Sequence, residues 1–371
     1  MTSNDTLPAD RRNAIGALRL LLASFVIFSH AHLLGGFAPE WLAGWSGGQV
    51  GAGMIGVQCF FALSGWLVTT SWRRDPSLPR FLWHRFLRLA PALWVCLAVT
   101  AFIYTPVVWL TTAEPTLMFP HLVSSAMGYF WHNLVLPRSQ IAVGSLPSYI
   151  PWAGDWNGSL WSLFYEGACY LMIAGMGLAS LLTRNRTVGT ALIGLLLGLH
   201  VVWATFHPSW LPGIVGRLYD TPGKLLTLHF LAGSVWAAWP EFTASALRRP
   251  YLAAVAAVAL AASWHGGFHA WLSPLVLPPA LLWLGMHGAL VDFERTVGGD
   301  YSYGLYIYGY PSQQLLAHFG VHRLGFYPYL LAGFALTLAL AIGSWRFVEK
   351  PAMSLRSAFW PRRPAQVPSR V

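Results

Sequence analysis

The stretch AIGALRLLLASFVIFSHAHLL, residues Ala14 to Leu34, is apolar and long enough to cross a lipid bilayer as an α-helix. It contains two ionisable residues, Arg19 and His30, eleven positions apart. In a helix this spacing is three turns, about 16 Å, so the two side chains share one face at different depths. Burying an arginine in hydrocarbon costs about 2.5–3.5 kcal/mol, so such residues usually face a polar interior.

We interpret this helix as one wall of a polar passage that forms an active site. A simpler alternative stays open at this point. Arg19 would then extend to the lipid headgroups, and His30 would be an ordinary histidine packed between helices.

The composition extends this prediction to the whole chain. Of 371 residues, 56% are hydrophobic and only 10% are charged, whereas about a quarter of the residues of a soluble domain are charged. This indicates an all-α polytopic membrane protein whose first helix is retained. The net charge of +10 does not indicate a nucleic-acid partner, because the basic residues are spread over the chain. Three scattered cysteines, Cys59, Cys96 and Cys169, favour packing over a metal site or disulfides.

Ten segments have a suitable length and polarity to span a membrane, at 14–34, 51–72, 86–107, 158–182, 187–206, 223–240, 251–265, 270–290, 301–319 and 326–345. With both termini in the cytoplasm, most arginines and lysines fall in inner loops, as the positive-inside rule requires. We expect a single transmembrane domain over 1–371, with short cytoplasmic tails at about 1–13 and 352–371. The short seventh segment leaves open a re-entrant unit with the eighth. In the long outer loop, Leu122 to Leu136 is expected to form a short interfacial helix.

A basic pair precedes the third segment. Arg85 and Arg88 are three positions apart, so both lie on one helical face at the cytoplasmic side. Two guanidiniums arranged in this way suit phosphate oxygens. The alternative is that they only set the topology and bind lipid headgroups.

The fourth segment carries a polar stripe of Ser162, Glu166 and Tyr170, spaced by four. A carboxylate inside a membrane needs a partner, and the candidates at similar depth are His30 and Arg19. A histidine held by a carboxylate becomes more basic, as the deprotonation of a hydroxyl requires. Glu166 as a purely structural partner of another helix stays an alternative.

Two further features lie near the C-terminus. Tyr303, Tyr306 and Tyr310 fall on one stripe of the ninth segment, where they either line a polar passage or anchor the helix at the membrane interface. Glu349 and Lys350 precede Pro351, so we expect the last helix to end there and its charges to pair locally.

Taken together, these motifs resemble the membrane acyltransferases of family 3. The matching pieces extend over nearly the whole chain and are Arg19 with His30, GVQCFFALSGWL (56–67, with Ser64), Arg85 and Arg88 before Pro91, SLWSLFYEGACY (159–170), YGLYIYGYP (303–311) and FVEKP (347–351). Many members have a histidine where this chain has Gly309, so the resemblance does not supply a second catalytic histidine.

The resemblance implies transfer of an acyl group, usually acetyl, from cytoplasmic acyl-CoA to a hydroxyl acceptor. By position, Arg85 and Arg88 would bind the CoA phosphates, with Ser64, Tyr303 and Tyr306 also at the donor site. Arg19 would stabilise the donor or a developing negative charge. His30 would be the general base or a transient acyl carrier, oriented by Glu166.

The expected location is a bacterial inner membrane, in contact with lipid. The expected acceptor is a glycan, a lipid-linked sugar or a small hydroxylated molecule, and no metal is expected. A second class of function, a glycan or lipid transporter or flippase, would use the same intramembrane residues as a pathway. The two related halves common in transporters are not visible in the sequence.

Overall fold

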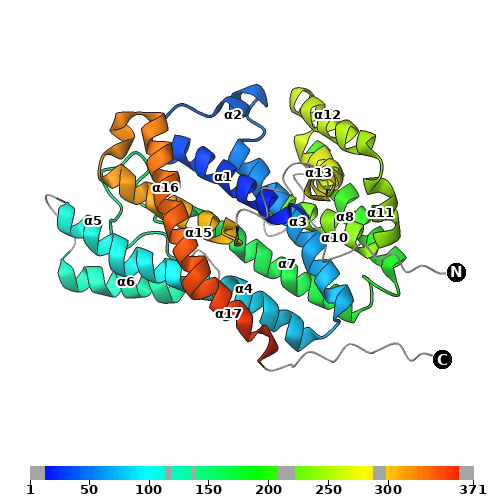
Figure 1. The fold of residues 1–371 in the computed structure, drawn as a ribbon. Helices are drawn as coiled ribbons and strands as arrows, with labels where there is room; N and C mark the ends of the chain where they lie inside the picture. The colour runs from blue at the N-terminus through cyan, green and yellow to red at the C-terminus, as the bar shows by residue number, and fades with distance from the viewer. Residues whose placement is uncertain (1–12, 113–117, 136–138, 207–221, 287–297, 359–371) are drawn as a thin grey trace.

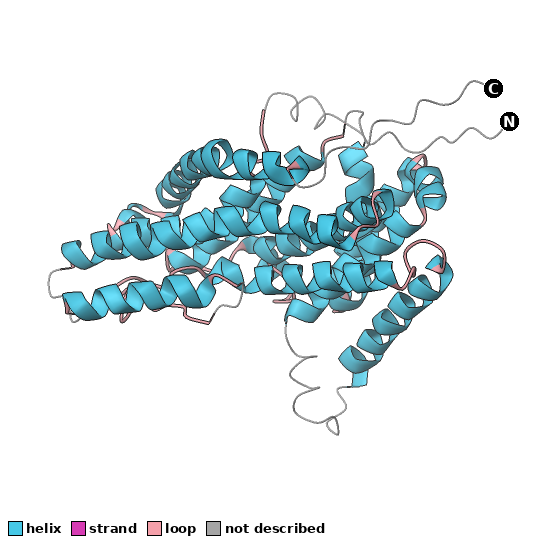
Figure 2. Cartoon of the chain, turned by 90° about the horizontal axis from the view of Figure 1, so that it is seen from below, coloured by secondary structure: helices cyan, strands magenta, loops and turns pink. Residues whose placement is uncertain are grey.

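The computed structural model describes residues 13–112, 118–135, 139–206, 222–286 and 298–358, and in these the regular elements are helices (Figures 1 and 2). The predicted all-α class is therefore confirmed. The longer helices are α1 (Ile15–Leu34), α3 (Ala52–Arg74), α4 (Leu78–Val99), α6 (Phe119–Asn133), α7 (Trp161–Leu178), α8 (Arg186–Phe206), α10 (Pro222–Ala238), α12 (Pro250–Gly266), α13 (His269–Met286), α15 (Ser302–His318) and α16 (Phe326–Ser344). The shorter ones are α2 (Trp41–Trp45), α5 (Thr105–Thr111), α11 (Pro240–Leu247) and α17 (Lys350–Ser354).

Each of the ten predicted segments contains a helix in its described part. Among the described residues, four continuous helical stretches are long and apolar enough to cross a membrane, namely Ile15–Leu34, Ala52–Arg74, Leu78–Thr111 and Phe326–Ser357. Their length and composition support the predicted membrane protein. The count of ten crossings and the cytoplasmic side of the termini stay predictions. Of the expected tails at about 1–13 and 352–371, residues 1–12 and 359–371 lie outside the described residues.

Helix α4 begins eight residues earlier than the third predicted span. Its first turn contains Pro79, whose ring fixes φ at a helical value. Proline lacks an N–H group, but N–H groups in the first turn of a helix have no intrahelical acceptor, so no hydrogen bond is lost. The helix passes through Pro91, and a π-helical turn, Thr100–Tyr104, then joins it to α5. The earlier start places Arg85 and Arg88 inside the helix rather than at its first turn.

Small residues bring the central helices close together. A Cβ atom on Gly65 of α3 would lie 1.9 Å from the backbone oxygen of Phe230 in α10, and one on Gly233 of α10 would lie 2.0 Å from that of Ala62. Gly56 faces the backbone of Leu22 in α1 in the same way, at 2.8 Å. Close packing through glycine is a common way for membrane helices to associate. It makes α3 the central helix, with α1 and α10 packed against it.

The loop predictions are partly confirmed. Helix α6 covers the expected short helix but begins three residues earlier than Leu122, and it packs on α4 and the π-turn. The end of that prediction, Leu136, lies outside the described residues. Helices α12 and α13 are two separate helices packed together, joined at Gly267 with a positive φ of 76°. The eighth segment is described only as far as Met286.

The predicted end of the last helix is wrong. After α16 a π-helical turn, Trp345–Glu349, leads directly into α17, so the helical stretch continues to Ser357. Pro351 lies in the first turn of α17, directly after this π-helical turn. Residues 352–357, expected as the start of a tail, are part of this folded segment.

Candidate active site

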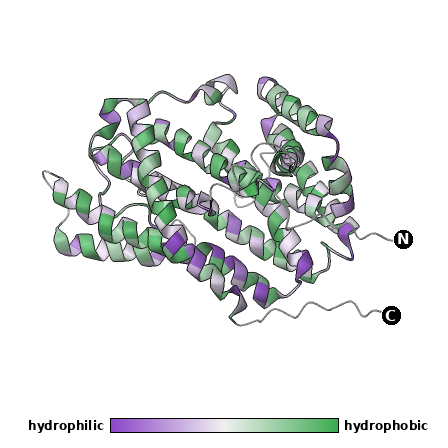
Figure 3. Ribbon diagram, viewed as in Figure 1, coloured by the Kyte–Doolittle hydropathy of each residue, from purple (hydrophilic) through white to green (hydrophobic). Residues whose placement is uncertain are grey.

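One cavity of about 390 Å³ lies among α1, α3, α4, α7, α15 and the segment after α16. Hydrophilic residues gather along α4 and α17 near this part of the bundle (Figure 3). Eight residues were given a catalytic or donor-site role from the sequence, and seven of them line the cavity, namely Arg19, Ser64, Arg85, Arg88, Glu166, Tyr303 and Tyr306. Only His30 does not line it. Segments far apart in the chain therefore bring the predicted donor-site residues together.

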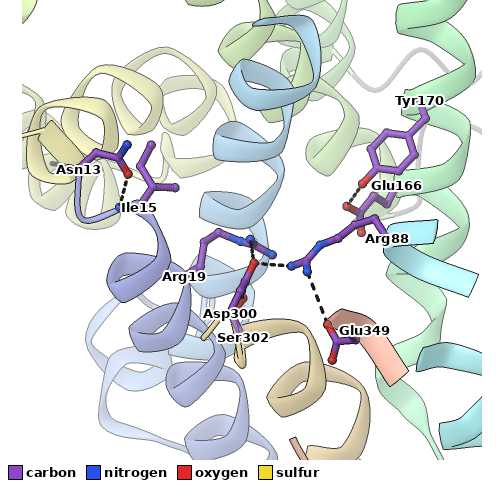
Figure 4. Close-up of polar contacts among 9 residues, drawn as sticks. All are labelled: Asn13, Ile15, Arg19, Arg88, Glu166, Tyr170, Asp300, Ser302 and Glu349. Carbon is purple, nitrogen blue, oxygen red and sulfur yellow. Dashed lines mark hydrogen bonds and ion pairs between the residues drawn. The ribbon is translucent and has the colours of Figure 1, made fainter. Parts of the chain in front are cut away.

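A cluster of ion pairs forms one wall of the cavity (Figure 4). The Oδ2 atom of Asp300, just before α15, accepts from Arg19 Nη1 and from Arg88 Nη2, both at 2.7 Å. Ser302 donates to the other carboxylate oxygen at 2.6 Å. Burial alone would raise the pKa of the Asp300 carboxyl, but the two guanidiniums hold that pKa below its usual range. Asp300 is therefore ionised and ties α1 to α4.

Glu349 completes the cluster from the π-helical turn after α16. Its Oε2 atom lies 3.5 Å from Arg88 Nη1, its Oε1 atom accepts from Ser344 at 3.0 Å, and the residue is 2% exposed. The expected local pairing in FVEKP is therefore wrong. The π-turn directs Glu349 into the bundle, where an unpaired carboxylate would be costly, and its cationic partner Arg88 comes from α4.

Glu166 lies on the cavity wall, but its partner differs from the one expected. Its Oε1 atom accepts a hydrogen bond from Tyr170, one turn along α7. The predicted pairing of Glu166 with His30 or Arg19 is not found. Arg19 pairs with Asp300 instead, and His30 lies three turns further along α1, outside the cavity lining. The stripe of Ser162, Glu166 and Tyr170 does line the cavity, as its spacing indicates.

His30 contacts the aromatic ring of Tyr310. Its ring packs edge-on against Tyr310, with centroids 5.0 Å apart, and its Nδ1 atom is buried without a hydrogen-bond partner among the described residues. Tyr310 donates to the Oδ2 atom of Asp155 at 3.5 Å. Gln314 donates to the backbone oxygen of Asp155 at 2.6 Å, so α15 and the loop before α7 are held together beside His30.

Three of the four tyrosines of α15, Tyr303, Tyr306 and Tyr310, connect these two places. Tyr303 donates to the backbone oxygen of Leu89, at 3.0 Å. Tyr306 shares a hydrogen bond of 2.5 Å with Ser162. Tyr303 and Tyr306 line the cavity, and Tyr310 contacts His30. All three are buried, so they line the interior and do not anchor the helix at the membrane interface.

Arg85 differs from its neighbour Arg88. Its guanidinium lies against the rings of Phe81 and Tyr170, 5.8 and 5.7 Å from their centroids, and no ion pair is formed with the described residues. Arg356, from the helical turn after α17, also lines the cavity. Arg85 is thus the arginine of the predicted pair that is available to an incoming anion.

Sequence reasoning missed Asp300 and Arg356. A signal for Asp300 exists, since it is an acid immediately before the tyrosine-rich segment, three positions from Tyr303. No comparable signal marks Arg356, which lies in what reads as a basic tail. Among the described residues, no group of three or more His, Cys, Asp or Glu side chains is close enough to hold a metal ion.

Comparison with known proteins shows the family of the chain. A family model described as an acyltransferase domain matches residues 12–346. The chain is 27% identical over 361 residues to an O-acetyl transferase of Shigella phage Sf6, covering 92% of this chain and 96% of the relative. It is also 27% identical over 390 residues to nodulation protein 10 of Rhizobium leguminosarum bv. viciae, covering 95% and 96%. No solved structure matches. The chain belongs to the membrane acyltransferases of family 3.

Proposed function

We propose that the protein is an integral membrane O-acyltransferase that moves an acyl group from acyl-CoA to a hydroxyl of a glycan or another cell-envelope or secreted acceptor. The supporting observation is the arginine-rich cavity, in which donor-site residues from separate helices converge. Acetyl is the favoured acyl group because one relative is named an O-acetyl transferase. A bacterial inner membrane, with the cavity open to the cytoplasm, is part of the proposal.

The charges of the cavity suit a phosphate-bearing donor. Four arginines and two carboxylates line it, Arg19, Arg85, Arg88 and Arg356 against Glu166 and Asp300, so positive charge is in excess. Arg88 is already paired with Asp300 and Glu349. We therefore assign Arg85 as the phosphate ligand and give Arg88 the role of holding the cavity wall in place.

The cavity also provides groups for the thioester end of the donor. Its apolar surface comes from Val57, Phe60 and Phe61. Its hydroxyl groups come from Ser64 and Tyr306. Attack on a thioester places negative charge on its carbonyl oxygen, and fixed donors beside that oxygen lower the barrier. Arg19, held in orientation by Asp300 at 2.7 Å, lies three turns from His30 on α1, so its proposed role is to stabilise the bound donor.

The acceptor is proposed to approach His30 from the outer end of the bundle. His30 takes the proton of the acceptor hydroxyl, whose oxygen attacks the thioester carbon. The carbon–sulfur bond then breaks, and CoA leaves as its thiol after taking up a proton. Since His30 lies outside the cavity lining, the thioester end of the donor has to extend past Tyr306 and Tyr310 to reach it. If His30 carries the acyl group itself, an acyl-imidazole should accumulate when acceptor is absent.

Mass spectrometry of surface glycans and secreted metabolites tests this proposal, using cells with the gene, without it and with it restored. We expect one species to lose the mass of an acyl group in the deletion strain and regain it on restoration. A deletion that leaves every acylated species unchanged contradicts the proposal. Loss of a whole glycan or lipid from the surface, with its acylation intact inside the cell, would favour the transporter alternative.

A further inference from the structure

The segment after α16 is fixed against the cytoplasmic end of α4. Trp83 donates its indole N–H to the backbone oxygen of Leu355 at 3.2 Å, and the His84 ring lies 3.4 Å from the backbone oxygen of Arg356. Met353 and Arg356 both line the cavity. The segment therefore forms part of the cavity wall and does not behave as a loose tail.

The four arginines of the cavity fall into two groups, those with an acidic partner and those without one. Arg19 and Arg88 have acidic partners, as described above. Arg85 and Arg356 form no ion pair with the described residues, and the Nε atom of each is buried without a hydrogen-bond partner among them. A guanidinium with a buried N–H group and no ion-pair partner is unfavourable, and an anion bound beside it removes that cost.

We propose that Arg85 and Arg356 together bind one phosphate group of the acyl donor, with one arginine from α4 and one from the C-terminal segment. Each guanidinium presents paired N–H groups that match phosphate oxygens. The family match ends at residue 346, so nothing in that match assigns a role to Arg356. This inference rests on the proposed acyl-CoA function and deepens it.

A lipid headgroup carries the same phosphate chemistry and is the other source of such an anion. The lining of the cavity favours the donor, because Ser64, Phe61 and Tyr306 line the same cavity as the two arginines. A headgroup would need only the arginines at the surface. A donor with a long thioester arm would use the whole cavity.

Binding measurements on the full-length protein in lipid nanodiscs test the inference. Acetyl-CoA is compared with acetyl-pantetheine, which has the same thioester arm and no phosphate. Arg356→Ala should weaken acetyl-CoA binding about 10- to 100-fold, the loss expected for one charge-assisted hydrogen-bonding group. Acetyl-pantetheine binding should not change, and Arg356→Lys should give an intermediate loss.

Arg346→Ala is the matched control, because Arg346 is an exposed arginine in the same segment that does not line the cavity. It should bind acetyl-CoA as the wild type does. Unchanged acetyl-CoA affinity in Arg356→Ala overturns the inference, and so does an equal weakening of both ligands, which would indicate a distorted cavity.

Native mass spectrometry with phosphatidylglycerol nanodiscs separates the two phosphate sources. Loss of bound phosphatidylglycerol from Arg356→Ala, with acetyl-CoA affinity retained, overturns the donor assignment. Acetyl-CoA binding that depends on Arg85 and not on Arg356 refutes only this inference. A wild-type protein that does not bind acetyl-CoA at all refutes the proposed function with it.

Discussion

The cavity and the surroundings of His30 are two polar regions of one bundle, and they differ in the kind of polar group they use. The cavity is held by ion pairs, with Arg19 and Arg88 sharing one oxygen of Asp300. Around His30 the contacts are an aromatic ring and hydrogen bonds from Tyr310 and Gln314. The difference suits a division of labour in which a charged donor binds at the first region and a hydroxyl is deprotonated at the second.

The largest expected effect comes from the region around His30. His30→Ala should lower acyl transfer about 10²- to 10⁴-fold, the usual contribution of a general base. Membrane insertion should be retained, because the variant removes no ion pair. Initial rates with purified wild-type and variant protein, after checking expression and monodispersity, measure this. Undiminished transfer at equal expression would exclude His30 from the reaction.

The cavity should respond to a loss of charge with a loss of stability. Asp300→Asn leaves Arg19 and Arg88 without a shared counter-charge, and we expect a loss of about 3 kcal/mol in the free energy of unfolding. The matched control is Glu241→Gln, which breaks the surface ion pair of Arg186 with Glu241. This pair has a distance of 3.2 Å, and the Glu241 side chain is 69% exposed. The control variant should cost under about 1 kcal/mol. Thermal unfolding in the same detergent compares them, and equal losses would mean that the cluster is not structurally important.

Arg85 separates donor binding from the integrity of the cavity, because it has no ion pair to lose. Arg85→Ala should raise the KM for acyl-CoA about 10-fold or more without a comparable loss of stability. Arg74→Ala, an exposed arginine outside the cavity, should change neither quantity. An unchanged KM in steady-state assays of Arg85→Ala would remove the assignment of the phosphate site.

The smallest effect is expected from the hydroxyl of Tyr310. Tyr310→Phe keeps the ring against His30 and removes the hydrogen bond to Asp155, so the rate should fall only a few-fold, corresponding to about 1 kcal/mol. Rates of this variant at several pH values check it. A loss as large as that of His30→Ala would show that the hydroxyl itself takes part in proton transfer.

Much of the fold and of the cavity could be predicted because hydropathy and helical spacing are local properties. Hydropathy located the helices, and the spacing of Arg85 with Arg88 and of Ser162 with Glu166 placed each pair on one face. Spacing does not reveal which distant segment lies opposite that face. The partners of Arg19 and Arg88 were therefore missed, since Asp300 is 281 and 212 positions away in the chain.

The pairing of His30 with Glu166 was wrong for a related reason. It was estimated from depth alone, with no information on which helices are neighbours. Helix α1 packs mainly on α3, α15 and α16, whereas α7 packs mainly on α3 and α10. Two residues at similar depth on such helices need not meet, and here each finds a tyrosine instead, Tyr310 for His30 and Tyr170 for Glu166.

The central claim is that the acyl donor occupies the arginine-rich cavity. Electron cryo-microscopy of the full-length protein with a non-hydrolysable acetyl-CoA analogue tests it most directly. We predict density for a phosphate within hydrogen-bonding distance of Arg85 and for the thioester arm beside Ser64 and Tyr306. An analogue bound elsewhere, with lipid or no density in the cavity, would contradict the account.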